Sequence, residues 1–234
     1  MVKKELIRRS PLRILENSIH GGVGAGNIGV IAARKGVGKT ACLVHIATDQ
    51  LFQDRHVLHV SFLDSTEHIV SWYEDIFREV ARRSNLDCAM DVHDSIIKNR
   101  VIMNFRQDGI HITEIEKSIR ELIDDGGFAA NTVIIDGYDF ARSSTEELRE
   151  FRTFSEKLGL ELWFSAELPG DLDEQEGGSV PETLRAVADE LSVVICLRPT
   201  DDFIRLELVK DHDAPSVADM HLKLDPATLL IAEE

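Results

Sequence analysis

Apolar runs and amphipathic segments alternate along most of the chain. Six short apolar runs have the length and composition of buried strands: 27–33, 57–62, 100–105, 132–136, 160–165 and 193–197. Apolar residues between them recur at helical spacing, and the expected helices cover 39–52, 65–83, a stretch from 113, 144–159 and 181–189. Because parallel strands need crossover connections, this alternation predicts an α/β fold with a mostly parallel central sheet flanked by helices.

The C-terminal part of the chain has a different pattern. Three strand-like segments follow one another with turn residues between them: 203–210, 220–224 and 228–231. Strands joined by turns pair in the antiparallel sense. The sequence therefore predicts an antiparallel extension at one edge of the sheet.

Two expected helices carry a sequence signal for their first residue. Thr113 and Ser144 are each followed three positions later by a glutamate, Glu116 and Glu147. In such a capping box the hydroxyl accepts a hydrogen bond from a backbone N–H of the first turn, and the glutamate bonds back to the cap. The pattern predicts that helices begin directly after Thr113 and Ser144.

Composition limits the classes of protein that the chain can belong to. It has 234 residues, 43% hydrophobic and 29% charged, which is typical of a globular protein with one large domain. With 42 acidic and 26 basic residues, the net charge is −16. Non-specific binding to nucleic acid depends on neutralising phosphates, so nucleic acid is a disfavoured partner, and an anionic membrane surface would repel the chain.

Several features favour a cytoplasmic location. No uninterrupted apolar run approaches the length of a membrane span, and no long apolar segment follows the basic N-terminus as it would in a signal peptide. Cys42, Cys88 and Cys196 are an odd number of cysteines at wide spacing, which favours buried, reduced thiols.

The N-terminal segment differs from the rest of the chain. We divide the chain into an N-terminal arm, residues 1–26, and one domain, residues 27–234. The arm is basic, since its first thirteen residues include Lys3, Lys4, Arg8, Arg9 and Arg13. Two interpretations remain open: the arm docks on an acidic neighbouring subunit, or it is a frayed, solvated terminus.

The clearest motif lies between the first expected strand and the first expected helix. Residues 33–40 read ARKGVGKT, a phosphate-binding loop (P-loop) with alanine in place of its first glycine. Gly36 and Gly38 allow the tight turn that points consecutive N–H groups at phosphate oxygens, and the following helix adds its positive dipole end. The expected nucleotide-binding residues are Arg34, Lys35, Gly36, Val37, Gly38, Lys39, Thr40 and Ala41.

Two side chains of this region point to a magnesium site. In a P-loop, Lys39 would pair with the β- and γ-phosphates, and the Thr40 hydroxyl would ligate Mg²⁺. The apolar strand 132–136 ends in Asp136. A carboxylate at the end of a parallel strand emerges beside the P-loop, where it would support the metal.

The loop and its surroundings resemble a known group of ATPases. Residues 31–41, with Ile46 and Ala47 after them, are similar to the P-loop of the DnaB-type replicative helicases, and residues 20–27 are similar to a segment of the KaiC-type ATPases. Both belong to the RecA-like P-loop NTPases. The resemblance extends over most of the chain from about residue 12 and implies a RecA-like fold, with ATP and Mg²⁺ bound between neighbouring subunits of a homo-oligomer.

The chain departs from this family where the catalytic glutamate is expected. Residues 61–67 read SFLDSTE, and Leu63 occupies one position of the glutamate that polarises the attacking water. Asp64 is the best available replacement, although its side chain is one methylene shorter. The alternative for Asp64 is a structural role near a helix N-terminus, where the helix dipole favours a negative charge.

A second departure concerns the residues that reach a neighbour's nucleotide. Lys210 matches the lysine of the family's Lys-x-Arg stretch, which the resemblance implies to contact the γ-phosphate across a subunit boundary, while the arginine has become His212. A neutral imidazole lacks the charged, bidentate fork of arginine. His212 is otherwise expected to be a solvated turn residue. Glu167 stands where the helicases carry a glutamine.

The sequence also argues against a DNA helicase-type motor. Residues 169–178, which the resemblance places at a nucleic-acid channel, contain four acids and no base and would repel a phosphate backbone. We expect an ATP·Mg²⁺-binding ATPase or slow ATPase switch that assembles with itself or acts on a protein partner. The alternative is a non-hydrolysing nucleotide-binding regulatory protein. ATP is favoured over GTP by the resemblance alone.

Overall fold

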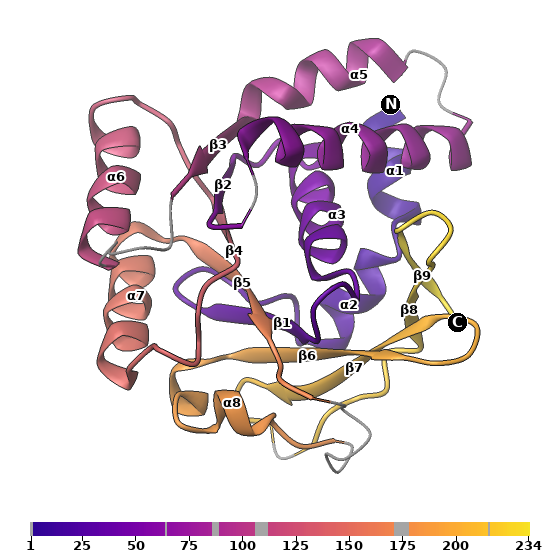
Figure 1. Ribbon diagram of the computed structural model, residues 1–234. Helices are drawn as coiled ribbons and strands as arrows, with labels where there is room; N and C mark the ends of the chain where they lie inside the picture. Colours follow the sequence, from indigo (N-terminus) through magenta and orange to yellow (C-terminus); the bar gives the residue numbers. More distant parts are fainter. Residues whose placement is uncertain (1, 64, 86–88, 106–111, 171–177, 215) are drawn as a thin grey trace.

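The computed structural model describes all residues except 1, 64, 86–88, 106–111, 171–177 and 215 (Figure 1). Within these residues the strands form one nine-stranded sheet in the order β3-β2-β4-β5-β1-β6-β7-β8-β9. The strands are β1 (Ile28–Ala33), β2 (Val57–Ser61), β3 (Arg100–Asn104), β4 (Thr132–Asp136), β5 (Glu161–Glu167), β6 (Val193–Pro199), β7 (Ile204–Asp211), β8 (Leu222–Leu224) and β9 (Ile231–Glu233).

The helices occupy most of the segments between the strands. The α-helices are α1 (Val2–Arg9), α2 (Leu12–Ser18), α3 (Lys39–Phe52), α4 (Thr66–Arg83), α5 (Ala89–Ile96), α6 (Ile112–Asp124), α7 (Thr145–Leu158) and α8 (Glu182–Arg185). In the described part of the chain, short 3-10 helices cover Ile97–Asn99 and Ala188–Glu190.

The type of strand pairing changes once across the sheet, from parallel to antiparallel. β3, β2, β4, β5, β1 and β6 run parallel, and β7, β8 and β9 continue the sheet in antiparallel pairs. The prediction of a mostly parallel sheet with an antiparallel C-terminal edge is confirmed. This architecture agrees with the RecA-like fold that the sequence analysis predicts.

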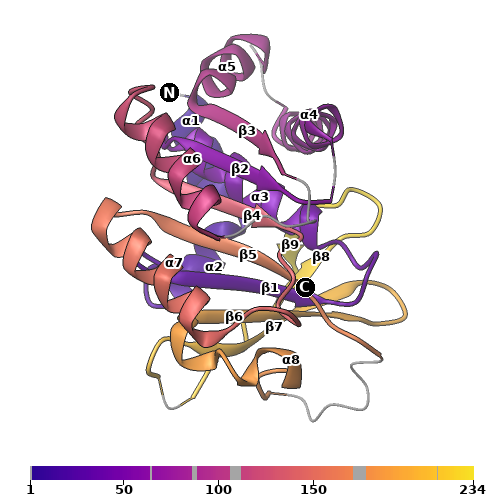
Figure 2. The same ribbon diagram turned by 60° about the vertical axis from the view of Figure 1, so that its left-hand side comes forward.

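Side chains of the buried strands divide between two apolar cores. On β1, Ile31 and Ala33 contribute to one core, and Val30 and Ala32 to the other, because successive side chains of a strand point to opposite faces. Helices α1–α5 cover the first face and α6–α8 the second. Figures 1 and 2 show α6 and α7 on the side of the sheet opposite to α3.

The N-terminal arm packs on its own domain. Leu6 of α1 and Leu12 and Leu15 of α2 are buried in the same core as α3. Arg13 makes an ion pair with Asp49 of α3. In this structure the arm is therefore neither frayed nor free of the domain. Its docking on a neighbouring subunit stays an untested expectation, as does the boundary at residue 26.

Local structure differs from the sequence-based expectations at several places. Thr113 is not an N-cap, since α6 already includes Ile112. The side chain of Ile112 is buried, with 5% of the residue exposed, and its packing favours the earlier start of the helix. The last strand begins at Ile231, because residues 225–229 form a turn that takes up part of the segment 228–231. Helix α5 was not expected. The capping box of Ser144 and Glu147 is present.

In the described part of the chain, no helix is both long and apolar enough to cross a bilayer.

Cys42 and Cys196 are buried and unpaired, while Cys88 lies outside the described residues. Burial raises the pKa of both described thiols, that of Cys196 to about 12. Both groups are therefore protonated and unreactive, as the sequence analysis expected of structural cysteines.

Two buried histidines predict that stability depends on pH. Burial lowers the pKa of His45 to about 4 and that of His59 to about 3, and the nearby Arg83 and Arg100 act in the same direction. Because an unfolded histidine titrates near ~6.5, the unfolded chain binds more protons than the folded chain below that pH. The two histidines should therefore not reduce the free energy of unfolding above about pH 6.5, and they should reduce it progressively as the pH drops towards about 4.

Urea unfolding at about pH 7.5 and about pH 5 measures this effect. We expect a loss of roughly 2 kcal/mol for each histidine between these two pH values. His45→Asn keeps an acceptor near the position of Nδ1 but does not titrate, so its pH-dependent loss should be about half that of the wild type. An equal loss in both proteins would contradict the assignment of His45.

Candidate functional site

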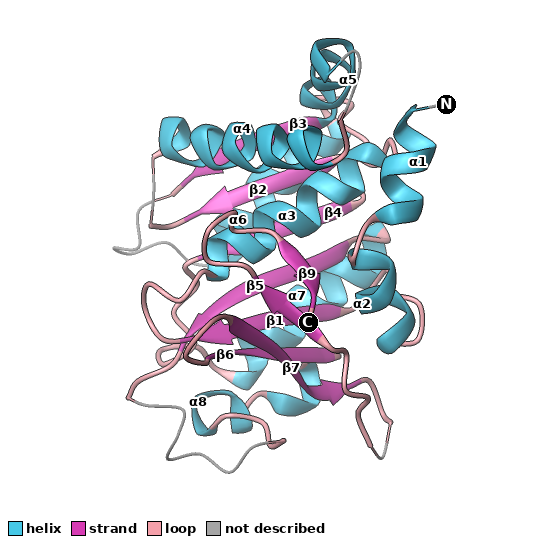
Figure 3. Cartoon of the chain, turned by 90° about the vertical axis from the view of Figure 1, so that its right-hand side faces the viewer, coloured by secondary structure: helices cyan, strands magenta, loops and turns pink. Residues whose placement is uncertain are grey.

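The candidate site lies at the carboxyl ends of the parallel strands, around the loop that joins β1 to α3. β1 ends at Ala33 and α3 begins at Lys39, so the loop is the five residues between them. Figure 3 views the molecule from the face of the sheet that carries α1–α4 and shows α3 lying in front of the strands. The first N–H groups of a helix have no intrahelical acceptor, and they form an anion-binding end.

Glycine is required at two positions of the loop. Gly36 has φ +81° and Gly38 has φ +113°, in the left-handed region that residues with a Cβ rarely adopt. Gly38 is also packed against the side chain of Leu224. A Cβ placed on Gly38 would lie 2.5 Å from Cδ2 of Leu224, which is too close. The loop therefore has the backbone form that the sequence motif predicts.

The side chain of Lys39, the first residue of α3, reaches back to the start of the loop. Its side chain is largely buried, with 8% of the residue exposed, and Nζ donates hydrogen bonds to the carbonyl oxygens of Ala33 and Arg34 at 3.0 Å each. Burial lowers the pKa of Lys39, while the nearby carboxylates of Glu167 and Asp136 act in the opposite direction. The ammonium group is thus held inside the loop, where a bound anion would compensate its desolvation.

The structure brings Thr40 and Asp136 together, as the sequence analysis expects. Thr40 Oγ1 donates to Asp136 Oδ2 at 2.8 Å. Asp136 is only 1% exposed, and within the described residues its other oxygen, Oδ1, is buried without a hydrogen-bond partner. A buried oxygen without a hydrogen-bond partner is costly, and this one fits a cation or a water bound to a cation.

This pair would not hold a metal ion by itself. Among the described residues there is no group of three or more His, Cys, Asp or Glu side chains arranged to bind a metal. Mg²⁺ keeps several waters in many protein sites and is bound by one or two protein oxygens together with substrate phosphates. Thr40 and Asp136 fit that arrangement, in which phosphate oxygens and water complete the ligand set.

A cavity of about 300 Å³ opens beside Lys39. Its lining joins side chains from four parts of the chain: the P-loop, the segment after β2, the segment after β4, and β5. The lining residues are Lys35, Lys39, Leu63, Gly137, Tyr138, Asp139, Phe140, Ala141, Ser165 and Glu167. The cavity therefore extends from the P-loop to the place where the catalytic glutamate of the family was expected.

Leu63 lines this cavity. Its side chain packs against Gly137, the residue after Asp136, so closely that a Cβ on Gly137 would overlap it. Leu63 is nevertheless 56% exposed, and an apolar side chain there can neither accept a proton from water nor orient it. Asp64, the candidate replacement, lies outside the described residues, so its catalytic role stays a prediction.

Lys210 is not part of the cavity. It lies on β7 and pairs with Val194 of β6, which pairs with Val30 of β1, three residues before the end of that strand. Its Nζ donates to the carbonyl oxygen of Ala188 at 2.8 Å. Lys210 therefore does not join Lys39 and Thr40 in the same chain, and its predicted contact with a neighbour's nucleotide remains a prediction.

His212 is a turn residue, as expected, but it is not simply solvated. Its ring nitrogens lie 2.8 Å from Oδ1 of the buried Asp211 and 3.1 Å from the carbonyl oxygen of Val23. It ties the segment before β1 to the end of β7. Residues 171–177 of the acidic loop lie outside the described residues.

Sequence reasoning missed two residues that shape the site. Ser165 Oγ of β5 accepts a hydrogen bond from the Gly137 N–H at 2.7 Å and so fixes the backbone next to Asp136. A serine among the buried apolar residues of β5 was the available signal. Leu224, which packs on Gly38, has no local signal, because 186 residues separate the two in sequence.

Comparisons with known proteins agree with the fold. The sequence matches no protein-family model and no curated protein, whereas 494 solved chains are similar in structure. One of them is described as an ATPase domain and is 16% identical to this chain. The similarity covers 94% of this chain and 88% of that one, with a TM-score of 0.69. At this identity the likeness establishes the fold.

Proposed function

We propose that this chain binds ATP with Mg²⁺ and acts in the cytoplasm as a nucleotide-dependent switch or slow ATPase that assembles with itself or with a protein partner. One observation carries the proposal: among the described residues the buried Asp136 keeps an oxygen without a hydrogen-bond partner beside Thr40, and its charge acts on the buried ammonium group of Lys39. The similar solved domain is described as an ATPase domain, which supports the same assignment.

Each residue of the loop has a role in this proposal. The backbone N–H groups of residues 34–41 surround the phosphates, and Gly36 and Gly38 give the loop the necessary conformation. Lys39 moves its hydrogen bonds from the loop carbonyls to phosphate oxygens. Thr40 and Asp136 hold the metal, which neutralises charge on the phosphates.

Leu63 favours weak or no hydrolysis in the isolated chain. A carboxylate at this point of the cavity would accept a proton from an attacking water, whereas leucine offers no such group. This supports the second candidate function, a regulatory protein whose bound nucleotide sets its shape or its oligomeric state. Lys210 would then report on the nucleotide of a neighbouring subunit without promoting its cleavage.

Equilibrium binding of ATP with and without Mg²⁺ tests the proposed function. We expect saturable binding that weakens when the metal is removed with a chelator, because Asp136 and Thr40 act on the phosphates through the metal. The absence of binding at millimolar ATP in the presence of Mg²⁺ would overturn the proposal.

Steady-state ATP turnover separates the switch from the enzyme. If Asp64 orients the water, Asp64→Asn should reduce turnover by on the order of a hundredfold, with little change in ATP affinity. Wild-type turnover that Asp64→Asn leaves unchanged would assign the water-orienting role to another group. ATP binding with no turnover would favour the regulatory protein.

A further inference from the structure

The C-terminal hairpin β8–β9 touches the P-loop. Leu224, the last residue of β8, is fully buried and packs on Gly38. The two strands of the hairpin have three residues each, and β9 ends the strand order of the sheet. A hairpin of this size is marginally stable by itself. Contacts with the rest of the domain must therefore decide where Leu224 lies.

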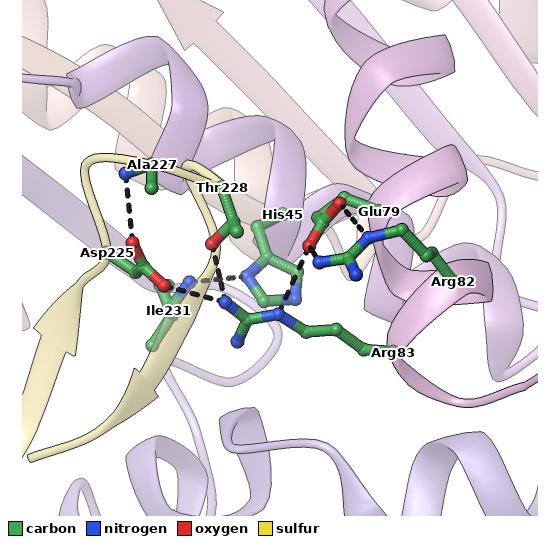
Figure 4. A network of polar contacts seen from close by, with 8 residues as sticks. All are labelled: His45, Glu79, Arg82, Arg83, Asp225, Ala227, Thr228 and Ile231. Atoms are coloured by element: carbon green, nitrogen blue, oxygen red, sulfur yellow. Dashed lines mark hydrogen bonds and ion pairs between the residues drawn. The ribbon is translucent and has the colours of Figure 1, made fainter.

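The first such contact comes from Arg83, the last residue of α4. Figure 4 shows its guanidinium group against the turn of the hairpin, where Nη2 donates to Asp225 Oδ2 at 2.6 Å and to Thr228 Oγ1 at 2.8 Å. Glu79 accepts a hydrogen bond from Arg83 Nε at 3.2 Å and orients the group. Burial acts to raise the pKa of Asp225, but hydrogen bonds, including the one from Arg83, outweigh it and lower the pKa.

The second contact comes from α3, the helix that the P-loop begins. His45 Nδ1 accepts a hydrogen bond from the backbone N–H of Ile231 at 2.9 Å. Ile231 is the residue that pairs with Leu224 across the hairpin. Because burial lowers the pKa of His45, its ring is neutral at neutral pH and Nδ1 is free to accept this bond.

β8 is held by its pairing with β7, in which Leu224 lies opposite Ile204, whereas β9 is the edge strand of the sheet. Packing is less complete beside the turn and β9. A cavity of about 260 Å³ lies beside the two polar contacts, lined by Leu6, His45, Arg83, Leu230 and Ile231, among others. Where a cavity replaces close packing, the segment next to it can shift at little cost in dispersion energy. Beyond the pairing of β8 with β7, the polar contacts of Arg83 and His45 are thus the specific constraints on the turn and on β9.

We propose that the β8–β9 hairpin is a positioning element for the P-loop, with Arg83 and His45 as positioning residues that keep Leu224 against Gly38. Its effect on nucleotide affinity rests on the proposed function. When the Arg83 contact is lost, the turn and β9 are held less tightly, Leu224 packs less closely on Gly38 and the loop adopts other conformations, so nucleotide binding must first restore the order of the loop. Hairpin docking and nucleotide binding therefore strengthen each other.

Hydrogen exchange in the nucleotide-free protein tests the positioning role directly. Arg83→Ala removes the contact, and Arg82→Ala is the matched control, because Arg82 also bonds to Glu79 and lies on the side away from the hairpin in Figure 4. We expect Arg83→Ala to speed exchange of residues 222–233 and 34–41 by on the order of tenfold. Arg82→Ala should leave both segments unchanged, and residues 132–136 serve as the reference for global unfolding.

ATP affinity gives the functional readout. Arg83→Ala should raise the Kd for ATP·Mg²⁺ by on the order of fivefold, and Arg83→Lys should recover part of that loss. Equal exchange of residues 34–41 in the two alanine variants, or faster exchange throughout the domain, would overturn the positioning role. If the wild type binds no ATP, the proposed function fails while the exchange result still decides the role of the hairpin. Asp225→Asn replaces Arg83→Ala if that variant does not fold.

Discussion

Lys39→Ala is expected to reduce the affinity for ATP·Mg²⁺ by on the order of a hundredfold while the domain stays folded. Phosphate binding needs the ammonium group, because its hydrogen bonds to phosphate oxygens are charge-assisted. The nucleotide-free fold does not depend on it. Burial lowers the pKa of Lys39, which means that the folded protein disfavours its charge, and alanine removes that cost.

Lys35→Ala is the matched control for this experiment. Lys35 has the same charge and lies in the same loop, but its side chain is exposed. An exposed charge in water contributes little, so the control should change ATP affinity by no more than about threefold. Binding of a fluorescent ATP analogue and thermal unfolding should be measured on both variants. Equal losses in the two variants would show that general charge, and not the buried position of Lys39, holds the nucleotide.

The parts of the site that the sequence predicts are those encoded by neighbouring residues. The P-loop follows a strand and opens a helix within a dozen residues, and glycine at positions 36 and 38 is required by φ values of +81° and +113°. Asp136 is predicted because it ends an apolar strand, and the order of parallel strands brings such ends to one edge. The Thr40–Asp136 hydrogen bond follows from these two placements.

Contacts between distant parts of the chain are not predictable in the same way. Leu224 packs on Gly38 and Arg83 bonds to Asp225, and neither pair has a periodicity or motif that links its members. Helix α5 was missed because it has eight residues, of which only Val92 and Ile96 are buried apolar side chains, too few for a helical pattern. The sequence of residues 1–26 does not distinguish a packed arm from a solvated terminus. The packing of its leucines in the same core as α3 is visible only in the structure.

Leu63→Glu is expected to increase ATP turnover by on the order of a hundredfold, the contribution of a positioned general base. Leu63 lines the cavity together with Lys39 and Ser165, so a carboxylate there faces the region that a γ-phosphate would occupy in the proposed complex. The substitution should cost little stability, because the position is 56% exposed and the new charge stays hydrated. Single-turnover and steady-state rates should both be measured, to separate cleavage from product release.

Leu63→Gln separates proton acceptance from the change of shape. Glutamine has nearly the same size as glutamate and can hydrogen-bond a water, but it cannot take the proton of that water. Faster turnover with glutamate alone would mean that the absence of a base at this position limits hydrolysis in the natural sequence. Equal rates in wild type and both variants would contradict that explanation. Hydrolysis would then be limited by a group that a second subunit supplies or by the conformation of the loop, and the hairpin contact of Leu224 with Gly38 would be the next element to vary.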